Sequence, residues 1–192
     1  MKTYRERSLS LAEENRTVRN ASIRKSFLQS AIITLFLILS GGISISQELI
    51  DEKVIPLTLA QKAANSAREK CEADGYRVSV AVVDSGGNLK TLVRSDGAGP
   101  HTTDSSFKKA YTSSSLRQPT KHLAELVVKV PSIQALGKMN DHILLLAGGL
   151  PIKFGKDTVG GIGVGGAPGG DLDEACALAG LKSINAAVPE QK

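Results

Sequence analysis

The sequence predicts an α+β domain in which an antiparallel sheet of about five strands is flanked by helices. Short runs of β-branched residues are separated by Gly-containing turns, which is typical of hairpins. Segments with small or apolar residues at helical spacing precede and follow these runs. The resulting order is α-β-β-α-α-β-β-β-α. Hairpin-linked strands are antiparallel neighbours, so this order favours a sheet covered by helices.

The first half of the domain follows a predicted linker at residues 47–56. A helix is expected from Thr58, which has capping-box spacing to the glutamine three positions on, and Gly75 is a good C-terminal stop. Residues 77–84 are rich in valine, and residues 89–94 form a second apolar run after a Ser-Gly-Gly-Asn turn. The two runs predict a β-hairpin.

Two helices and a short helical or irregular piece are expected in the middle of the domain. The first begins at Thr102 or Thr103, either of which is a suitable capping residue, and ends near Leu116. The second begins at Thr120, directly after a proline. Residues 131–138 then form the short piece.

Three strands and a last helix complete the domain. Residues 143–147 are apolar and predict a strand, and residues 150–154 and 158–165 predict two more around a Gly-Lys-Asp turn. The last helix is expected from Asp171, again with capping-box spacing, to about Ser183.

The glycine-rich run at residues 160–170 resembles a phosphate-binding loop only superficially. It contains no GxxxxGK[ST] pattern, and the expected element order lacks the parallel βαβ unit of a dinucleotide site. Glycines at alternating positions of a strand instead leave one sheet face without side chains. The run therefore predicts a close approach of backbone to a neighbouring element.

The N-terminal segment predicts export. Residues 26–46 contain no charge and have an apolar centre at 31–39, with a basic residue, Lys25, directly before them. Small residues near position 46 suit cleavage before Gln47. The apolar run is short for a membrane-spanning helix. We expect residues 1–46 to be a signal peptide and the protein to be periplasmic or extracellular, and an uncleaved membrane anchor is the alternative.

The net charge of +5 does not indicate a nucleic-acid partner. Residues 1–46 hold seven of the 24 basic residues and only three of the 19 acidic ones, so the remainder is close to neutral. Aromatic residues make up 4% of the chain, and there is no tryptophan. A nucleic-acid interface needs a basic surface and often stacking aromatics.

The two cysteines, Cys71 and Cys176, fall in separate predicted helices. In an oxidising compartment such a pair can form a disulfide, and the alternative is two buried free thiols. They cannot make a zinc site alone, because no CxxC or neighbouring histidine completes a ligand set.

Few residues carry an obvious chemistry. The chain has no GxSxG nucleophile motif and no HExxH metal motif. His122 and His142 are most simply a solvated helix residue and a strand-border residue. His101 follows a Gly-rich loop and precedes a helix, a place where an imidazole is suited to ligate haem iron. Its position alone does not distinguish a ligand from an ordinary surface histidine.

The chain resembles the HbpS/GlcG family, which includes the C-terminal domain of PduO-type proteins. The resemblance covers residues 57–184 and predicts one domain at 57–186 with a flexible tail at 187–192. The matching pieces are LTLA at 57–60, VSVAVVD at 78–84, DGAGPHT at 96–102, KAYT at 109–112, QPT at 118–120, GGLPI at 148–152, GGIGVGG at 160–166 and Asp173-Glu174.

This resemblance implies a profilin-like three-layer α/β/α sandwich that assembles into symmetric homo-oligomers. It also implies a haem-binding module, with haem b as the cofactor and a link to iron or oxidative stress, and not a conventional enzyme. His101 becomes the preferred axial ligand. The residues that could flank the porphyrin or its propionates are Thr102, Phe107, Lys108 and Tyr111. The alternative is plain helix packing for Phe107 and Tyr111 and solvation for Lys108.

Two alternatives remain open at this point. A GlcG-like protein would bind or act on a short organic acid, with Lys109 and Arg94 holding the carboxylate through charge-assisted hydrogen bonds. A ligand-free interaction module would instead bind a membrane sensor protein.

Overall fold

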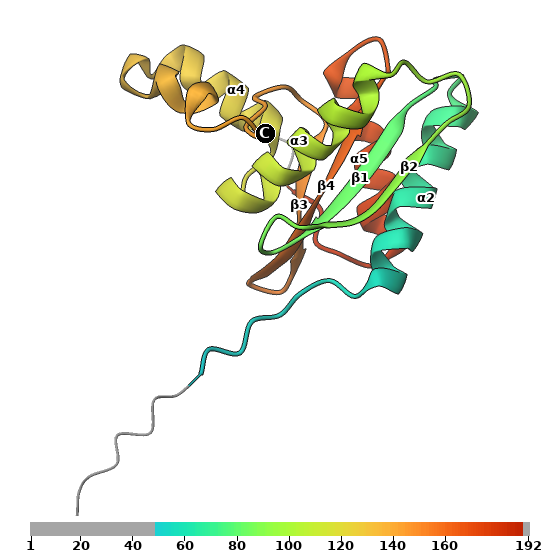
Figure 1. Ribbon diagram of the computed structural model, residues 1–192, viewed down its shortest axis with the longest axis horizontal. Helices are drawn as coiled ribbons and strands as arrows, with labels where there is room; N and C mark the ends of the chain where they lie inside the picture. Colours follow the sequence, from blue (N-terminus) through green and yellow to red (C-terminus); the bar gives the residue numbers. More distant parts are fainter. Residues whose placement is uncertain (1–48, 190–192) are drawn as a thin grey trace, which may run out of the picture. The chain divides into compact units, whose positions relative to one another are not determined.

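The computed structural model describes residues 49–189. The predicted signal peptide at 1–46 lies outside these residues. Within 49–189, none of the helices is both long and apolar enough to span a bilayer. Residues 51–189 belong to one compact unit, shown in Figure 1.

The sheet has four strands, all antiparallel, in the order β2-β1-β4-β3. β1 and β4 are the central strands, and β2 and β3 form the edges. The sequence predicted about five strands, so the α+β class and the antiparallel sheet are confirmed but the strand number is wrong. The strands are β1 (Ser79–Asp84), β2 (Leu89–Arg94), β3 (Gly149–Phe154) and β4 (Asp157–Gly165).

The missing strand is the one predicted at residues 143–147, which form an irregular segment. The backbone N–H of Leu144 donates to the Thr112 hydroxyl at 2.8 Å, so this amide is satisfied by a helix side chain and not by a strand. Gly148, at φ +113°, then turns the chain into β3. A short apolar run can belong to a strand or to an irregular segment, a choice that periodicity does not resolve.

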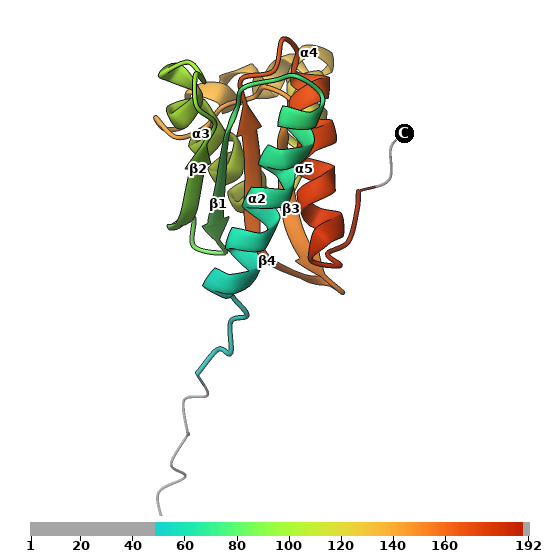
Figure 2. The ribbon, with the colours of Figure 1, turned by 90° about the vertical axis from the view of Figure 1, so that its right-hand side faces the viewer.

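Helices α2 (Leu57–Ala73) and α5 (Gly170–Ser183) cover one face of the sheet, as Figure 2 shows. The main core lies between them and the sheet and is built from small helix residues and branched strand residues. Alanines line the buried side of α2, which allows this helix to lie close to the strands. Gly75, at φ +89°, follows its last turn as predicted.

Helix α3 (His101–Leu116) covers the other face and lies directly on β4. Gly161, Gly163 and Gly165 of β4 make this approach possible. A Cβ built on Gly163 would lie 2.2 Å from the Ser106 carbonyl oxygen, and one on Gly161 would lie 2.3 Å from that of Ala110. The predicted bare sheet face is therefore present, and the backbone of α3 fills it.

Helix α4 (Thr120–Lys129) and the 3-10 helix η1 (Pro131–Lys138) follow α3. The predicted caps are not formed. No side-chain cap is made at the start of α2, α3, α4 or α5. The Thr120 hydroxyl accepts a hydrogen bond from the Gly149 backbone N–H at 2.9 Å, and so joins α4 to β3.

Candidate functional site

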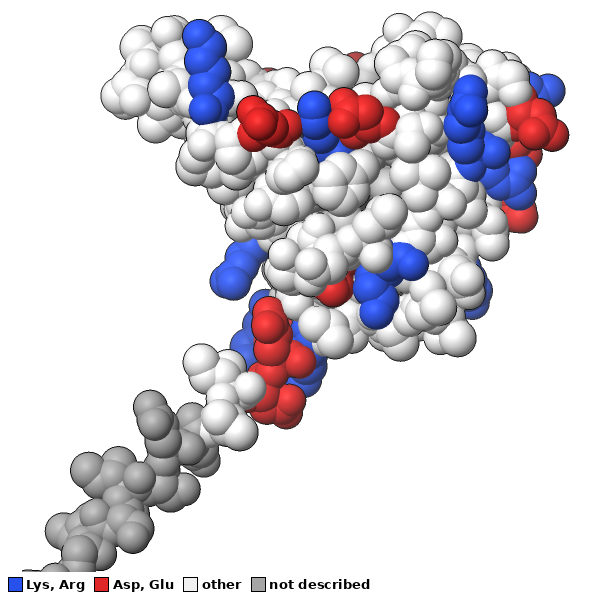
Figure 3. Space-filling model, viewed as in Figure 1, with Lys and Arg blue, Asp and Glu red and all other residues white. Residues whose placement is uncertain are grey.

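Two of the residues expected to contact haem, His101 and Lys108, lie on one side of α3, whereas Phe107 packs partly against the small core cluster of Ala81, Val83 and Ala110. His101 is the first residue of the helix and is exposed. Positions three, four and seven residues apart share a helix face, so Asp104 and Lys108 lie on the same side as His101. The Lys108 ammonium pairs with the Asp104 carboxylate at 3.1 Å. On the face shown in Figure 3, the surface over α3 and β2 carries few charged side chains.

The loop before α3 fixes the position of His101. The Thr102 hydroxyl donates to the Gly99 carbonyl oxygen at 2.6 Å and shares a hydrogen bond with the Ser79 hydroxyl at 2.7 Å. A Cβ added to Gly99 would lie 2.6 Å from the His101 ring, so the bare glycine leaves room for the imidazole. Thr102 was expected to contact the cofactor. It is fully buried and instead positions the residue beside it.

Phe107 and Tyr111 form an aromatic cluster with His142, for which the sequence predicted only a strand-border position. The His142 ring lies edge-on to Phe107, with centroids 5.5 Å apart, and 5.2 Å from the Tyr111 ring. Phe107 and Tyr111 are themselves 6.2 Å apart. Tyr111 also covers Gly87 in the β1–β2 turn, where a Cβ would lie 2.7 Å from the ring. His142 comes from the irregular segment after η1, where no sequence pattern links it to α3.

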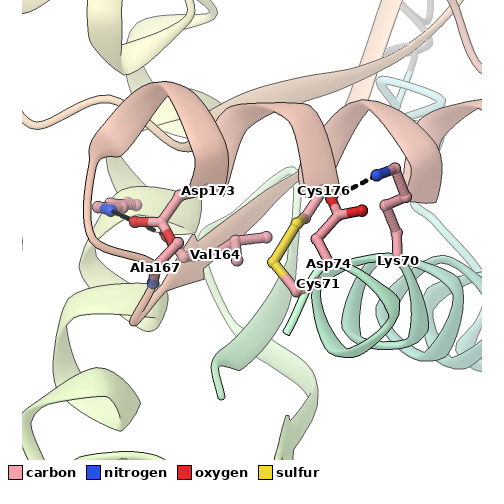
Figure 4. Close-up of a disulfide and its surroundings, with 8 residues drawn as sticks. Lys70, Cys71, Asp74, Val164, Ala167, Asp173 and Cys176 are labelled. Carbon is pink, nitrogen blue, oxygen red and sulfur yellow. Dashed lines mark hydrogen bonds and ion pairs between the residues drawn. A yellow bond between two sulfur atoms is a disulfide. The ribbon is translucent and has the colours of Figure 1, made fainter. Parts of the chain in front are cut away.

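Lys109 has a different environment from the one expected. Its side chain is 2% exposed, and its ammonium donates to the Asp173 carboxylate at 2.7 Å and to the Val164 carbonyl oxygen at 2.9 Å. Asp173 also accepts from the Ala167 backbone N–H at 2.9 Å, and Figure 4 shows Ala167 and Val164 beside it. Burial raises the pKa of Asp173, and Lys109 opposes this rise. Lys109 therefore balances a carboxylate of its own chain and is not open to a ligand.

Arg94 was the second expected anion contact. Its guanidinium donates to the Ala98 carbonyl oxygen in the loop before α3. Arg94 thus holds the loop that leads to His101, whereas Lys109 is buried against the start of α5. The structure does not join the two cations in one anion site.

Cys71 of α2 and Cys176 of α5 form a disulfide, with Cα atoms 5.5 Å apart (Figure 4). Both residues are fully buried in the main core. Of the two alternatives that the sequence left open, the structure has the bridge and not the free thiols. Throughout residues 49–189, no group of three or more His, Cys, Asp or Glu side chains is placed to hold a metal ion.

Three comparisons with known proteins are informative. A family model described as "Haem degrading protein HbpS-like" matches residues 55–182. A crystal structure of an HbpS double mutant from Streptomyces reticuli is 43% identical, with a TM-score of 0.67, and the match covers 74% of this chain and 95% of that one. Protein GlcG of Escherichia coli K12 is 28% identical over 111 residues, which are 58% of this chain and 81% of GlcG.

A more distant structure shares the fold. A crystal structure of a PduOC:heme complex is 20% identical, with a TM-score of 0.65, and the match covers 70% of this chain and 97% of that one. The family match spans most of the domain from the residues just before α2 to the end of α5. The chain therefore belongs to the HbpS-like family.

Proposed function

We propose that this protein binds haem on the outward side of α3, with His101 as the axial ligand of the iron. The observation that carries the proposal is the exposed imidazole of His101. It stands at the start of a helix that also presents Lys108, Phe107 and Tyr111. An exposed imidazole can supply the ligand nitrogen without first giving up an internal contact.

The residues present fit the parts of a haem. His101 would supply the axial nitrogen, and the rings of Phe107 and Tyr111 would offer apolar contact to the porphyrin. Lys108 would face a propionate, because its pair with the exposed carboxylate of Asp104 is a weak surface pair that a propionate could replace. When bound, haem would supply iron-centred redox chemistry. These side chains would bind and orient it.

The family supports this proposal. A relative with 43% identity is named HbpS, and the family description refers to haem. The PduOC:heme complex adds that the same fold occurs in a haem-bound protein, at an identity that supports the fold alone. For this chain we propose capture, storage or sensing of haem b. We also propose a homo-oligomer, in which a second copy would shield a haem that one copy leaves open, and contact with a membrane sensor.

We further propose that the protein is exported, with residues 1–46 removed as a signal peptide. The buried disulfide between Cys71 and Cys176 supports export, because such bonds persist in oxidising compartments. The intact mass of protein recovered after expression of the full chain tests both the removal of residues 1–46 and the disulfide. The expected mass is that of the chain from Gln47, lower by about two hydrogens than after reduction. Retained residues before Gln47 would favour the anchor.

A short organic acid is the less favoured ligand. The two side chains expected to hold its carboxylate, Lys109 and Arg94, have partners within the chain. For Lys109 the partner is a buried carboxylate, and a ligand would have to displace it.

The test of the proposal is a haemin titration followed by absorbance, with three variants beside the parent protein. We expect a saturable Soret shift that His101→Ala loses and that His122→Ala, on α4, keeps. Loss in His142→Ala but not in His101→Ala would move the ligand to the aromatic cluster. Absence of any saturable shift would refute haem binding.

The same samples separate storage from degradation, the activity that the family description names. With a reductant and oxygen present, a storage or sensing protein keeps its Soret band over time. A haem-degrading protein bleaches the band and releases iron, which a chelator of ferrous iron detects. We expect the band to persist.

A further inference from the structure

A cleft of about 700 Å³ lies away from the proposed haem face. It is bounded by β3, α4, α5 and the segment after α5, and none of His101, Phe107, Lys108 and Tyr111 lines it. Its volume falls within the range of small-molecule sites, roughly 300 to 1,000 Å³. The N–H of Ala187 donates to the Lys153 carbonyl oxygen at 2.9 Å, so β3 holds the segment that forms one wall.

The cleft combines apolar walls with a half-buried carboxylate. Leu150, Pro151 and Leu178 contribute apolar surface from β3 and α5. Glu174 of α5 also lines it, and its Oε2 atom is buried without a hydrogen-bond partner among the described residues. A buried acceptor left without a donor costs roughly 1 to 3 kcal/mol, and more when it is charged. The backbone N–H of Gly148 acts on the same carboxyl, so the missing donor is the one at Oε2.

The charges around Glu174 leave a negative excess. Lys121 and Asp171 pair at 2.7 Å and offset each other. Glu125 also lines the cleft, and its negative charge acts on Glu174. Of the other charged residues that line the cleft, Lys153 is positive, whereas Glu125 and Glu174 are negative.

We propose that this cleft binds a small organic ammonium ion that carries an apolar chain. The ammonium would donate to Glu174 within the field of Glu125, and the chain would lie along Leu150, Pro151 and Leu178. A bare metal ion fits less well, because no group of three or more metal-ligating side chains occurs in the described part of the chain. This inference goes beyond haem binding and does not depend on it.

The burial of Glu174 agrees with this inference. Burial raises the pKa of its carboxyl above the ordinary value, against the opposing effect of Lys121. An ammonium ion replaces the lost hydration with a charge-assisted hydrogen bond, which is stronger than a bond between neutral groups.

The test is isothermal titration of the purified protein with n-hexylamine at pH 7.5. Hexan-1-ol and hexanoate have the same chain length and serve as ligands without the positive charge. We expect saturable binding of hexylamine at least tenfold tighter than that of either comparison ligand. Amide NMR shifts on addition of hexylamine should concentrate in β3, α4 and α5.

Two carboxylate variants locate the site. Glu174→Gln keeps the shape of the side chain but removes its charge, and should weaken hexylamine binding about tenfold. Glu69→Gln, an exposed carboxylate on α2, should leave binding unchanged, as should His101→Ala. Thermal denaturation of each variant shows whether it is folded before binding is compared.

Three results would overturn the proposal. Equal binding of hexan-1-ol would show an apolar cleft without charge recognition, and tighter binding of hexanoate would show an anion site. No saturable heat and no localised NMR shifts at 10-fold to 100-fold molar excess of hexylamine would show that the cleft takes no such ligand. Failure here with an intact Soret response would leave the haem proposal untouched.

Discussion

Replacing Lys109 by methionine should destabilise the fold, because it removes one partner of a buried ion pair. The substitution keeps an unbranched chain but leaves Asp173, 4% exposed, with the Ala167 N–H as its remaining partner in the structure. Removing one partner of a buried pair typically costs roughly 3 to 5 kcal/mol. Asp173 can escape this cost by taking up a proton. From an ordinary pKa of 3.8, protonation at pH 7 costs about 4 kcal/mol, which sets an upper limit.

The expected loss in free energy of unfolding is therefore about 3 to 4 kcal/mol at pH 7. In the variant, burial raises the folded-state pKa of Asp173 above its unfolded value, so the native state binds the proton more tightly. The stability of the variant therefore falls as pH rises from the unfolded-state pKa of Asp173 to its folded-state pKa. Its loss of stability relative to the parent shrinks towards pH 4 by up to about 1.4 kcal/mol per pH unit. Urea denaturation at pH 4, 5.5 and 7, with the disulfide intact, measures the deficit.

A matched variant and a double variant make the test specific. Lys108→Met removes the neighbouring lysine, whose pair with Asp104 is on the surface, and should cost no more than about 0.5 kcal/mol. Adding Asp173→Asn to Lys109→Met removes the unpaired charge and keeps an acceptor for Ala167, so the double variant should regain stability at pH 7. A Lys109→Met protein within 1 kcal/mol of the parent, or a double variant no more stable than the single one, would refute the reasoning.

Two further predictions rest on steric contact and on burial. Gly163→Ala should destabilise by about 3 kcal/mol, because its Cβ would meet α3 backbone, whereas Gly169→Ser, with open space around it, should change stability by less than about 0.5 kcal/mol in urea denaturation. For Glu174, the folded-state pKa is raised, so its carboxyl lowers stability progressively as pH rises above about 4.5. Glu174→Gln should match the parent at pH 4 and exceed it at pH 7, and equal stabilities at both pH values would contradict the burial effect.

Much of the fold could be predicted from local pattern. The hairpin at β1 and β2, the helix stop at Gly75 and the bare face of β4 all depend on residue types with strong local preferences. The prediction of a fifth strand was wrong because a short apolar run, such as residues 143–147, does not reveal whether it pairs in a sheet or forms an irregular segment. The predicted caps were not formed because each helix begins at or before the residue expected to cap it, and Thr120 instead hydrogen-bonds Gly149 of β3.

The candidate site could be predicted less completely. The exposed place of His101 follows from a loop composition that the sequence shows directly. Contacts between residues far apart in the sequence cannot be predicted from local composition. Nothing local indicates that Lys109 meets Asp173, 64 positions later, or that His142 joins Phe107 and Tyr111. The burial of Thr102 and Lys109 was not predicted for the same reason, since burial of a polar side chain is decided by the element that packs on it.

The pair of Lys109 and Asp173 also shows how the domain is joined across the sheet. Lys109 comes from α3 on one face, and Asp173 begins α5 on the other. Their contact passes beside Gly148, where a Cβ would lie 2.6 Å from that of Asp173 and 3.0 Å from the lysine nitrogen. One turn further along α5, Cys176 is bound to α2. Helix α5 is thus joined to α3 on the opposite face of the sheet and to α2, its neighbour on the same face. Because His101 begins the helix that carries Lys109, the proposed ligand residue stands on an element that is anchored across the sheet.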